Sequence, residues 1–168
     1  MKKVYLDTSA FIKIFVEEDR QTSDIVERII DLARNKKIII ILSDWVINES
    51  FAVIDKNKQN GKITKSETQQ ILSELVSMLK AEIQYETFTI YSITEKIVVA
   101  SRYIIQDYHI AASDALHVFI SASAECDCFV SADKKLERRL TTGIHKLVAC
   151  DIGIKKDVKI MFERIINS

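Results

Sequence analysis

The stretch Ile38-Ile39-Ile40-Ile41-Leu42 is an unbroken apolar run, bounded by Lys36-Lys37 before it and by Ser43-Asp44 after it. It is far too short to cross a bilayer, which needs about 20 apolar residues. A β-branched run of this length is typical of a strand buried on both faces of a parallel sheet. Ser43 or Asp44 can cap a helix directly after it. The stretch therefore predicts a strand followed by a helix, the repeating unit of an α/β fold.

The same order of strand and helix recurs on both sides of this stretch. Strands are predicted at 3–6, 83–90, 128–131 and 146–150, and helices at 10–18, 23–35, 44–56, 64–80, 93–108, 114–124, 134–140 and 155–168. Because parallel neighbours need crossover helices, we predict a three-layer α/β/α sandwich with a mainly parallel central sheet. Thr64-Lys65-Ser66-Glu67 has the pattern of a capping box, so the helices before and after it are expected to form a helical hairpin.

The length and composition fit one ordinary globular domain. The chain has 168 residues, of which 48% are hydrophobic and 29% charged. We expect residues 1–150 to form the domain and residues 151–168 a C-terminal extension of it. Lys and Arg together number 24, as do Asp and Glu, so the net charge is zero. This excludes binding of duplex DNA through a global positive field. A net charge near zero also favours association, so a homodimer is expected.

The three cysteines, Cys126, Cys128 and Cys150, do not have the number or spacing of a disulfide framework. No secretory leader is recognised, and no apolar run is long enough for a membrane span. We therefore expect a cytoplasmic protein with reduced thiols and no membrane association.

Four acidic residues stand where a parallel sheet binds its ligands, outside the carboxyl ends of the strands. Asp7 ends the first strand and Asp133 follows the strand at 128–131. Asp114 lies at the start of a helix, and Glu49 lies early in another. We predict that the four carboxylates converge in one pocket.

Each of these acids alone has an ordinary explanation as a helix cap or a solvated residue. However, Glu49 stands between Ile47 and Phe51, and Asp114 stands among alanines, where an unpaired charge is costly. Mg²⁺ or Mn²⁺, which prefer hard oxygen ligands, would offset that cost and the mutual repulsion of the carboxylates. Such a pocket suits the hydrolysis of a phosphodiester.

Several segments together resemble the PIN-domain family, in particular its VapC-type toxin ribonucleases. They are Leu6-Asp7-Thr8-Ser9-Ala10-Phe11, Glu49, Ser113-Asp114-Ala115-Leu116-His117 and Val130-Ser131-Ala132-Asp133. The resemblance spans residues 3 to about 150. The chain departs from compact members of this group by its hairpin at about 57–85 and by the residues after Cys150.

The resemblance implies a PIN-like fold and a metal-dependent hydrolysis of RNA that a cognate antitoxin silences. It implies that Asp7 and Asp114 are the chief metal ligands, with Asp133 nearby and Glu49 completing the cluster. It also gives Thr8 or Ser9 an assisting role, and Ser9 is a candidate for substrate binding.

Basic residues follow Asp133 closely, which makes Lys134, Lys135 and Arg138 candidates for contact with RNA phosphates, and Lys56 a weaker one. The alternative for them is a solvated helix face. His117, three residues after Asp114, is expected to pack in the core rather than bind metal.

Trp45, near the start of a helix, is likewise expected to pack in the core rather than stack on a base. Other functions are less well supported. An aspartyl-phosphate phosphatase would need a second acid at the position of Ser9, and dinucleotide binding would need glycines before Gly61. A catalytically idle PIN-like scaffold that binds RNA or protein stays open as the alternative, although the presence of all four acids argues against it.

Overall fold

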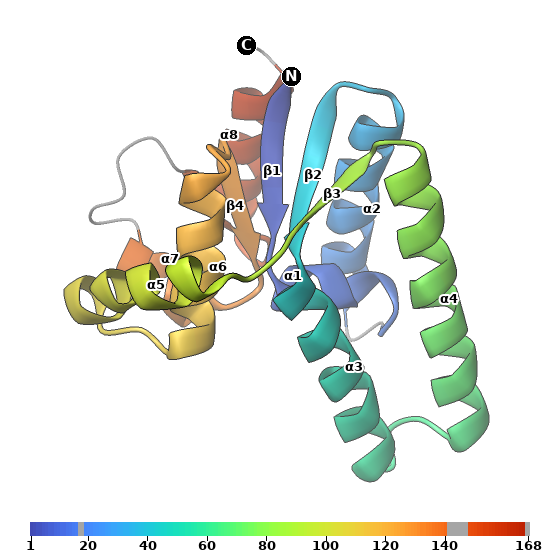
Figure 1. Ribbon diagram of the computed structural model, residues 1–168. Coiled ribbons are helices and arrows are strands. Elements are labelled where there is room, and N and C mark those ends of the chain that lie inside the picture. Colours follow the sequence, from blue (N-terminus) through green and yellow to red (C-terminus); the bar gives the residue numbers. More distant parts are fainter. Residues whose placement is uncertain (17–18, 141–147, 167–168) are drawn as a thin grey trace.

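The computed structural model describes residues 1–16, 19–140 and 148–166. Its centre is a five-stranded sheet in the order β3-β2-β1-β4-β5, in which every neighbouring pair is parallel (Figure 1). The strands are β1 (Lys2–Leu6), β2 (Ile38–Ser43), β3 (Phe88–Tyr91), β4 (Cys128–Ser131) and β5 (Val148–Asp151). The first strand therefore lies in the middle, with β2 on one side and β4 on the other.

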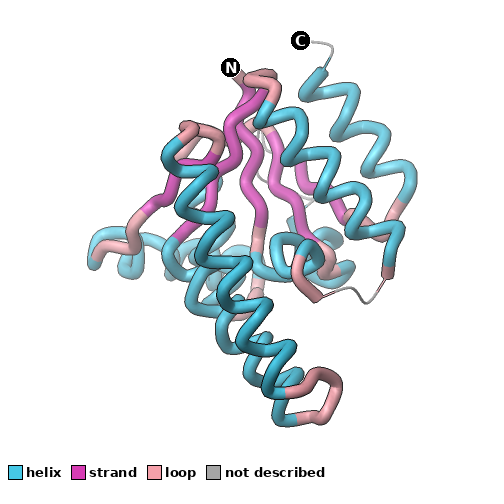
Figure 2. Tube along the Cα trace, turned by 90° about the vertical axis from the view of Figure 1, so that its right-hand side faces the viewer, coloured by secondary structure: helices cyan, strands magenta, loops and turns pink. Residues whose placement is uncertain are grey.

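Helices cover both faces of this sheet, as Figure 2 shows when the molecule is turned. They are α1 (Thr8–Phe11), the 3-10 turn η1 (Ile12–Ile14), α2 (Arg20–Arg34), α3 (Asp44–Gln59), α4 (Lys65–Gln84), α5 (Glu95–Tyr108), α6 (Ala112–Ser123), α7 (Lys134–Leu140) and α8 (Lys155–Ile166). The predicted three-layer α/β/α sandwich is confirmed.

The isoleucine run forms β2 and is buried on both faces of the sheet, as its composition predicts. Ile38, Ile40, Ile41 and Leu42 are each at most 2% exposed. Burial of such side chains contributes about 25 cal/mol for each Å² of apolar surface, so this strand is a main source of stability. At the far end of the chain, Met161, Phe162 and Ile165 of α8 belong to the same hydrophobic core. None of the helices in the described ranges has the length and apolarity needed to cross a membrane.

Helices α3 and α4 pack against each other as the predicted hairpin, which projects beyond the carboxyl ends of the strands (Figure 1). The capping box is present: Thr64 Oγ1 accepts from the Glu67 amide at 3.2 Å, and the Glu67 carboxylate accepts from the Thr64 amide at 2.7 Å. Ser43 caps α3 by accepting from the Val46 amide at 3.2 Å. The hairpin thus forms one wall beside the edge of the sheet where the four acids were predicted.

The predicted strand at 83–90 is wrong in its first half, because α4 continues to Gln84 and β3 begins only at Phe88. The cause is a tertiary contact at the end of the helix. Arg34 Nη2 of α2 donates to Glu82 Oε1 at 2.6 Å, and the Thr87 hydroxyl donates to the other Glu82 oxygen. These bonds hold the last turn of α4 in helical form.

The first predicted helix is also shorter than expected. It changes to the 3-10 turn η1 and ends at Ile14, and Asp7 caps its first turn. Residues 146–147 of the predicted last strand and residues 167–168 of the predicted last helix lie outside the described residues.

Candidate functional site

The four acids reach the same cavity from four different elements. Asp7 follows β1 and Asp133 follows β4, and the two strand ends are joined by the Asp7 amide, which donates to the Val130 carbonyl at 3.0 Å. Glu49 comes from α3 and Asp114 from the first turn of α6. The cavity has a volume of about 390 Å³ and is lined by Asp7, Thr8, Ser9, Glu49, Ala52, Val53, Lys56, Asp114, His117 and Asp133.

Asp7 is the most buried of the four, with only 4% of its surface exposed. Its Oδ1 accepts two hydrogen bonds at 2.8 Å, one from the Ser9 hydroxyl and one from the Ala10 amide that begins α1. Burial raises the pKa of Asp7, while the neighbouring His117 and the hydroxyl of Ser131 act in the opposite direction. The carboxylate is thus placed firmly, but its charge is only partly compensated.

Ser9, a predicted substrate-binding residue, lines the cavity and also joins the two strand ends. Its hydroxyl donates to Asp7 Oδ1 and accepts from the Ala132 amide at 2.8 Å. The Ser131 hydroxyl lies 3.2 Å away and accepts from the Asp133 amide. Because these partners occupy the Ser9 hydroxyl, its geometry favours positioning of Asp7 over contact with a ligand.

Glu49 is held by three hydrogen-bond donors. The Thr8 hydroxyl and His117 Nε2 bind Glu49 Oε2, the latter at 2.9 Å, and Trp45 Nε1 donates to Oε1 at 2.9 Å. Burial alone would raise the pKa of Glu49, but the bonds from His117 and Thr8 outweigh it and the pKa lies below its ordinary value. Glu49 is therefore an ionised carboxylate with a defined orientation.

His117 and Tyr5 belong to this arrangement although the sequence analysis did not find the pair. His117 is 3% exposed and its Nδ1 lies 2.8 Å from the Tyr5 hydroxyl oxygen, which also lies 3.0 Å from Ser43 Oγ. Burial raises the pKa of Tyr5, so this hydroxyl keeps its proton. The expectation that His117 only packs in the core is incomplete, because its ring touches Glu49. The expectation for Trp45 is wrong: its side chain is 38% exposed and binds Glu49.

Asp114 has no hydrogen-bond donor among the described residues, and it is not a helix cap, because α6 begins after Ala111 without a side-chain cap. Burial raises the pKa of Asp114, His117 lowers it, and the charges of Asp133, Asp7 and Glu49 raise it further. These directions agree with the position of the four carboxylates around one cavity.

Asp133 is exposed and serves as the cap of α7. Its Oδ1 accepts from the amides of Lys135 and Leu136 at 2.8 and 3.3 Å. The second oxygen of Asp133 has no partner among the described residues. Asp133 is therefore both a helix cap and a residue of the cavity, as Asp7 is.

The predicted phosphate-binding lysines are placed differently from expectation. Lys134 and Lys135 are exposed on α7 and do not line the cavity, and the side chain of Arg138 lies outside the described part of the structure. Lys56, on the hairpin wall, does line it. In the described residues Lys56 has no carboxylate partner, so it is the better placed cation for a phosphate.

The oxygen ligands that the cavity offers fit a divalent cation. Among the described residues, no group donates to the carboxylate oxygens of Asp114 or to the second oxygen of Asp133. A doubly charged ion would relieve the repulsion described above. Within residues 1–16, 19–140 and 148–166 no three His, Cys, Asp or Glu side chains are grouped closely enough to surround an ion on their own. Mg²⁺ commonly uses only one or two carboxylates and completes its shell with water and phosphate oxygens, so the arrangement suits an ion shared with a substrate.

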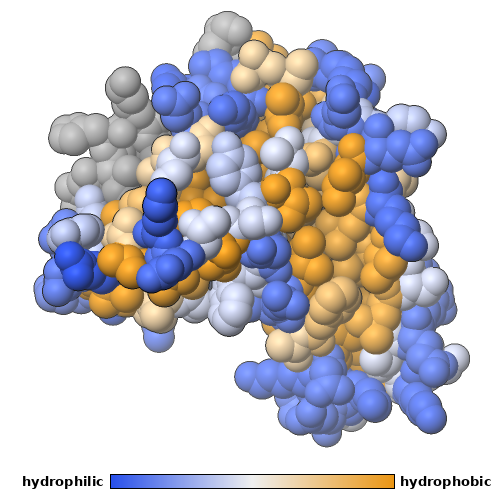
Figure 3. Space-filling view, viewed as in Figure 1, coloured by the Kyte–Doolittle hydropathy of each residue, from blue (hydrophilic) through white to orange (hydrophobic). Residues whose placement is uncertain are grey.

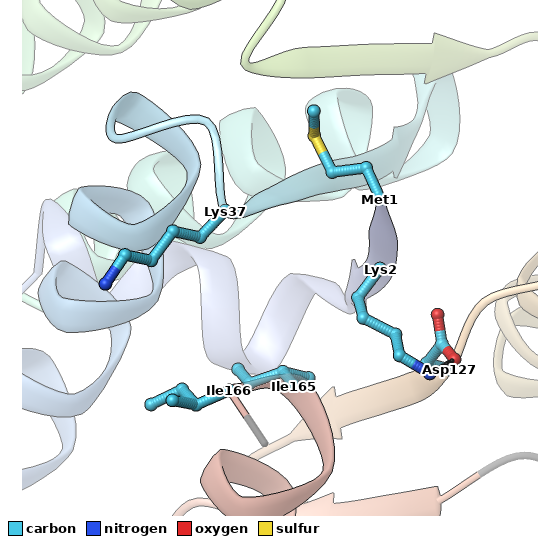
Figure 4. A pocket seen from close by; sticks show the side chains of 6 residues that line it. All are labelled: Met1, Lys2, Lys37, Asp127, Ile165 and Ile166. Carbon is cyan, nitrogen blue, oxygen red and sulfur yellow. Dashed lines mark hydrogen bonds and ion pairs between the residues drawn. The ribbon is translucent and has the colours of Figure 1, made fainter. Parts of the chain in front are cut away.

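A second cavity, of about 540 Å³, lies at the opposite end of the sheet, where β1 begins (Figure 4). It is lined by Met1, Lys2, Lys37, Asp127, Ile165 and Ile166. Its single acid, Asp127, is already paired with Lys2 Nζ at 2.9 Å and with the Lys3 amide at 3.0 Å. This larger cavity therefore lacks the chemistry of the first.

Comparison with known proteins identifies the family and the fold of the chain. The family model of the PIN domain matches residues 4–139, whereas no curated protein matches the chain. VapC20 of Mycobacterium tuberculosis, described as a sarcin-ricin loop cleaving toxin, is 14% identical with a TM-score of 0.55, over 80% of this chain and 93% of that one. A protein of Pyrobaculum aerophilum is 11% identical with a TM-score of 0.61, over 99% and 91%.

VapBC2 of Rickettsia felis, solved on a DNA fragment from its promoter, is 18% identical with a TM-score of 0.57, over 88% of this chain and 96% of that one. At such low identities these structures establish the fold and no more. The family match itself runs from β1 into α7 and so includes all four acids. The chain belongs to the PIN domain family.

Proposed function

We propose that this chain is a cytoplasmic Mg²⁺- or Mn²⁺-dependent endoribonuclease and the toxin of a toxin-antitoxin pair. The observation that carries the proposal is the meeting of Asp7, Glu49, Asp114 and Asp133 in one cavity at the carboxyl edge of a parallel sheet. Membership of the PIN domain family supports a nuclease. The similar structure of VapC20, which is described as a sarcin-ricin loop cleaving toxin, supports RNA as the substrate.

In this proposal each acid has a distinct part. Asp7 and Asp114 would hold the cation, Asp133 would offer its second oxygen, and Glu49 is an oriented acceptor at the wall of the cavity. A bound divalent cation would supply the positive charge that lowers the pKa of a water molecule and neutralises the phosphate. Lys56, across the cavity on α3, binds a phosphate oxygen of the RNA and helps to orient the strand.

The proposal includes partners as well as a substrate. Figure 3 shows apolar side chains gathered over the hairpin of α3 and α4 on the face that looks toward α5, and Ala52 and Val53 carry apolar surface into the cavity itself. A cognate antitoxin segment that covers this surface would also block access to the acids. On α5, Val98, Val99 and Tyr103 are each more than half exposed, which favours association into the proposed homodimer.

The proposal also covers the cellular compartment and the domain boundaries. The three cysteines are buried and none of them forms a disulfide, as in a protein of a reducing compartment. We assign residues 1–150 to the nuclease domain and residues 151–168 to an extension of it, because α8 shares its core.

The test is cleavage of total RNA by the purified protein, followed by sequencing of the new RNA ends. Cleavage is expected with Mn²⁺ or Mg²⁺ and not with EDTA, and Asp114→Asn is expected to abolish it. Asp24→Asn, an exposed acid on α2, is the matched control and should cleave like the wild type. Equal cleavage by the Asp114→Asn variant would refute the site, and absence of both cleavage and saturable Mn²⁺ binding in the wild type would favour the idle scaffold.

A further inference from the structure

The carboxylate of Glu49 has little free acceptor capacity left. An ionised carboxylate offers about four lone-pair positions, two on each oxygen. The Thr8 hydroxyl and His117 Nε2 occupy both positions of Oε2, and Trp45 Nε1 occupies one position of Oε1. A single acceptor position, on Oε1, remains for a ligand in the cavity.

The orientation of the His117 ring follows from its two partners. Since an ionised carboxylate can only accept, the ring nitrogen facing Glu49 must carry a proton, so Nε2 is the donor. The other nitrogen, Nδ1, lies 2.8 Å from the Tyr5 hydroxyl, which prevents the ring from flipping without loss of both bonds. His117 is thus a fixed donor toward Glu49.

Tyr5 is itself fixed by the sheet. Its ring is fully buried and stacks on Phe129 of β4, with centroids 5.5 Å apart and planes 5° from parallel. Its hydroxyl oxygen is hydrogen-bonded to Ser43 Oγ at 3.0 Å, and Ser43 caps the helix that carries Glu49. The bonds from Ser43 through Tyr5 and His117 to Glu49, which we name the Glu49 relay, therefore connect β1, β2, α3 and α6.

We propose that Tyr5 and His117 are positioning residues for Glu49: they saturate Oε2 and make Glu49 present a single Oε1 acceptor to the cavity. Glu49 would then offer one acceptor position on Oε1 to a bound cation or to a water molecule in the cavity. The relay is a property of the fold, but its importance for catalysis rests on the proposed nuclease function. Nothing in the sequence marks it, because its members are up to 112 residues apart.

The first test is independent of nuclease activity. Nitrogen-15 and proton NMR of the wild type in EDTA should show a proton on His117 Nε2 that exchanges slowly with water, since the ring is buried and bonded. In Tyr5→Phe the ring loses its second partner while the aromatic stack is kept, so this proton should exchange faster. A wild-type ring with its only proton on Nδ1 would overturn the relay, whatever the protein does to RNA.

The second test uses matched variants of His117. His117→Gln keeps an N–H donor that can reach Glu49, whereas His117→Leu has a similar volume without a donor. Loss of an outer partner of this kind typically lowers metal affinity or activity by about 10- to 100-fold. We expect His117→Leu to show such a loss in Mn²⁺ affinity and in kcat, with little change in KM, and His117→Gln to recover most of it.

Equal Mn²⁺ affinity of the Leu variant and the wild type would contradict the relay, and so would equal losses in the Leu and Gln variants. Thermal unfolding of both variants in EDTA checks that they are folded. If the wild type binds Mn²⁺ but cleaves no RNA, the proposed function fails while the binding and NMR results still decide the relay.

Discussion

Replacement of Asp7 by Asn should stabilise the metal-free protein while removing its response to Mn²⁺. Asp7 is 4% exposed, and the raised pKa of its carboxyl shows that the folded protein holds this charge at a cost. Asn has nearly the same shape, and its Oδ1 can accept the same bonds from the Ser9 hydroxyl and the Ala10 amide. Asn is also a good helix cap, so α1 should begin as before.

The size of this stability change follows from the hydrogen bonds that Asp7 Oδ1 accepts in the folded protein. Burying an isolated charge costs several kcal/mol. Hydrogen bonds to a charged group return about 1.5–3 kcal/mol each, so the two bonds to Asp7 Oδ1 offset most of the cost. A residual penalty of about 1–2 kcal/mol, removed in the variant, would raise the Tm of a chain of this size by roughly 2–8 °C.

The pH dependence has a definite sign. Because the folded pKa of Asp7 is raised, the wild type loses stability as pH rises from the unfolded pKa, about 3.9, through the folded value. The advantage of Asp7→Asn should therefore be largest at neutral pH and shrink on acidification. Thermal unfolding of both proteins in EDTA across this range measures it. A variant that is less stable than the wild type at neutral pH would refute the reasoning.

In the presence of Mn²⁺ the wild type should be more stable than Asp7→Asn. A ligand present at 100 times its Kd stabilises the fold by about 2.7 kcal/mol, so the wild-type Tm should rise clearly on addition of the ion. The Tm of Asp7→Asn should stay unchanged. An equal rise in both proteins would show that Asp7 does not hold the cation.

Three further predictions concern other parts of the molecule. Burial alone would raise the pKa of Asp127, but the hydrogen bonds from the Lys3 amide and Lys2 outweigh it, so the pKa is lowered. Asp127→Asn should therefore lower the free energy of unfolding by roughly 0.5–1 kcal/mol above about pH 4 and by little at lower pH. Urea unfolding at pH 7 and pH 3 measures this difference. Lys56→Gln should raise KM for RNA and weaken its salt dependence with kcat unchanged, and a loss confined to kcat would argue against phosphate binding. Leu75→Ala, at a fully buried position of α4, should cost about 2–5 kcal/mol, and a smaller loss in denaturant unfolding would mean that the hairpin adds little to the core.

The strands and caps could be predicted where local sequence alone decides them. The isoleucine run has one good solution, a strand buried on both faces, and the capping box at Thr64 is satisfied within a few residues. The segment at 83–90 could not be divided correctly, because its first residues fit either a helix end or a strand. The contact between Arg34 and Glu82, 48 residues apart, decides in favour of the helix.

The acids could be proposed from their places at strand and helix ends, but their partners could not. Thr8, Trp45 and His117 bind Glu49 from three elements, and only Trp45 is close to it in sequence. A histidine among apolar residues looks like a packing residue in sequence. Its hydrogen-bonding role follows only from the sheet, which places the Tyr5 hydroxyl beside its ring.

The most direct test of the account is the anomalous diffraction signal of Mn²⁺ in crystals of the wild type grown with the ion. We predict a peak within coordination distance of carboxylate oxygens of Asp7 and Asp114, and none at that place in Asp114→Asn crystals. A cavity with ordered side chains and no Mn²⁺ peak, or a peak held by other residues, would contradict the claim that these four acids form a metal site.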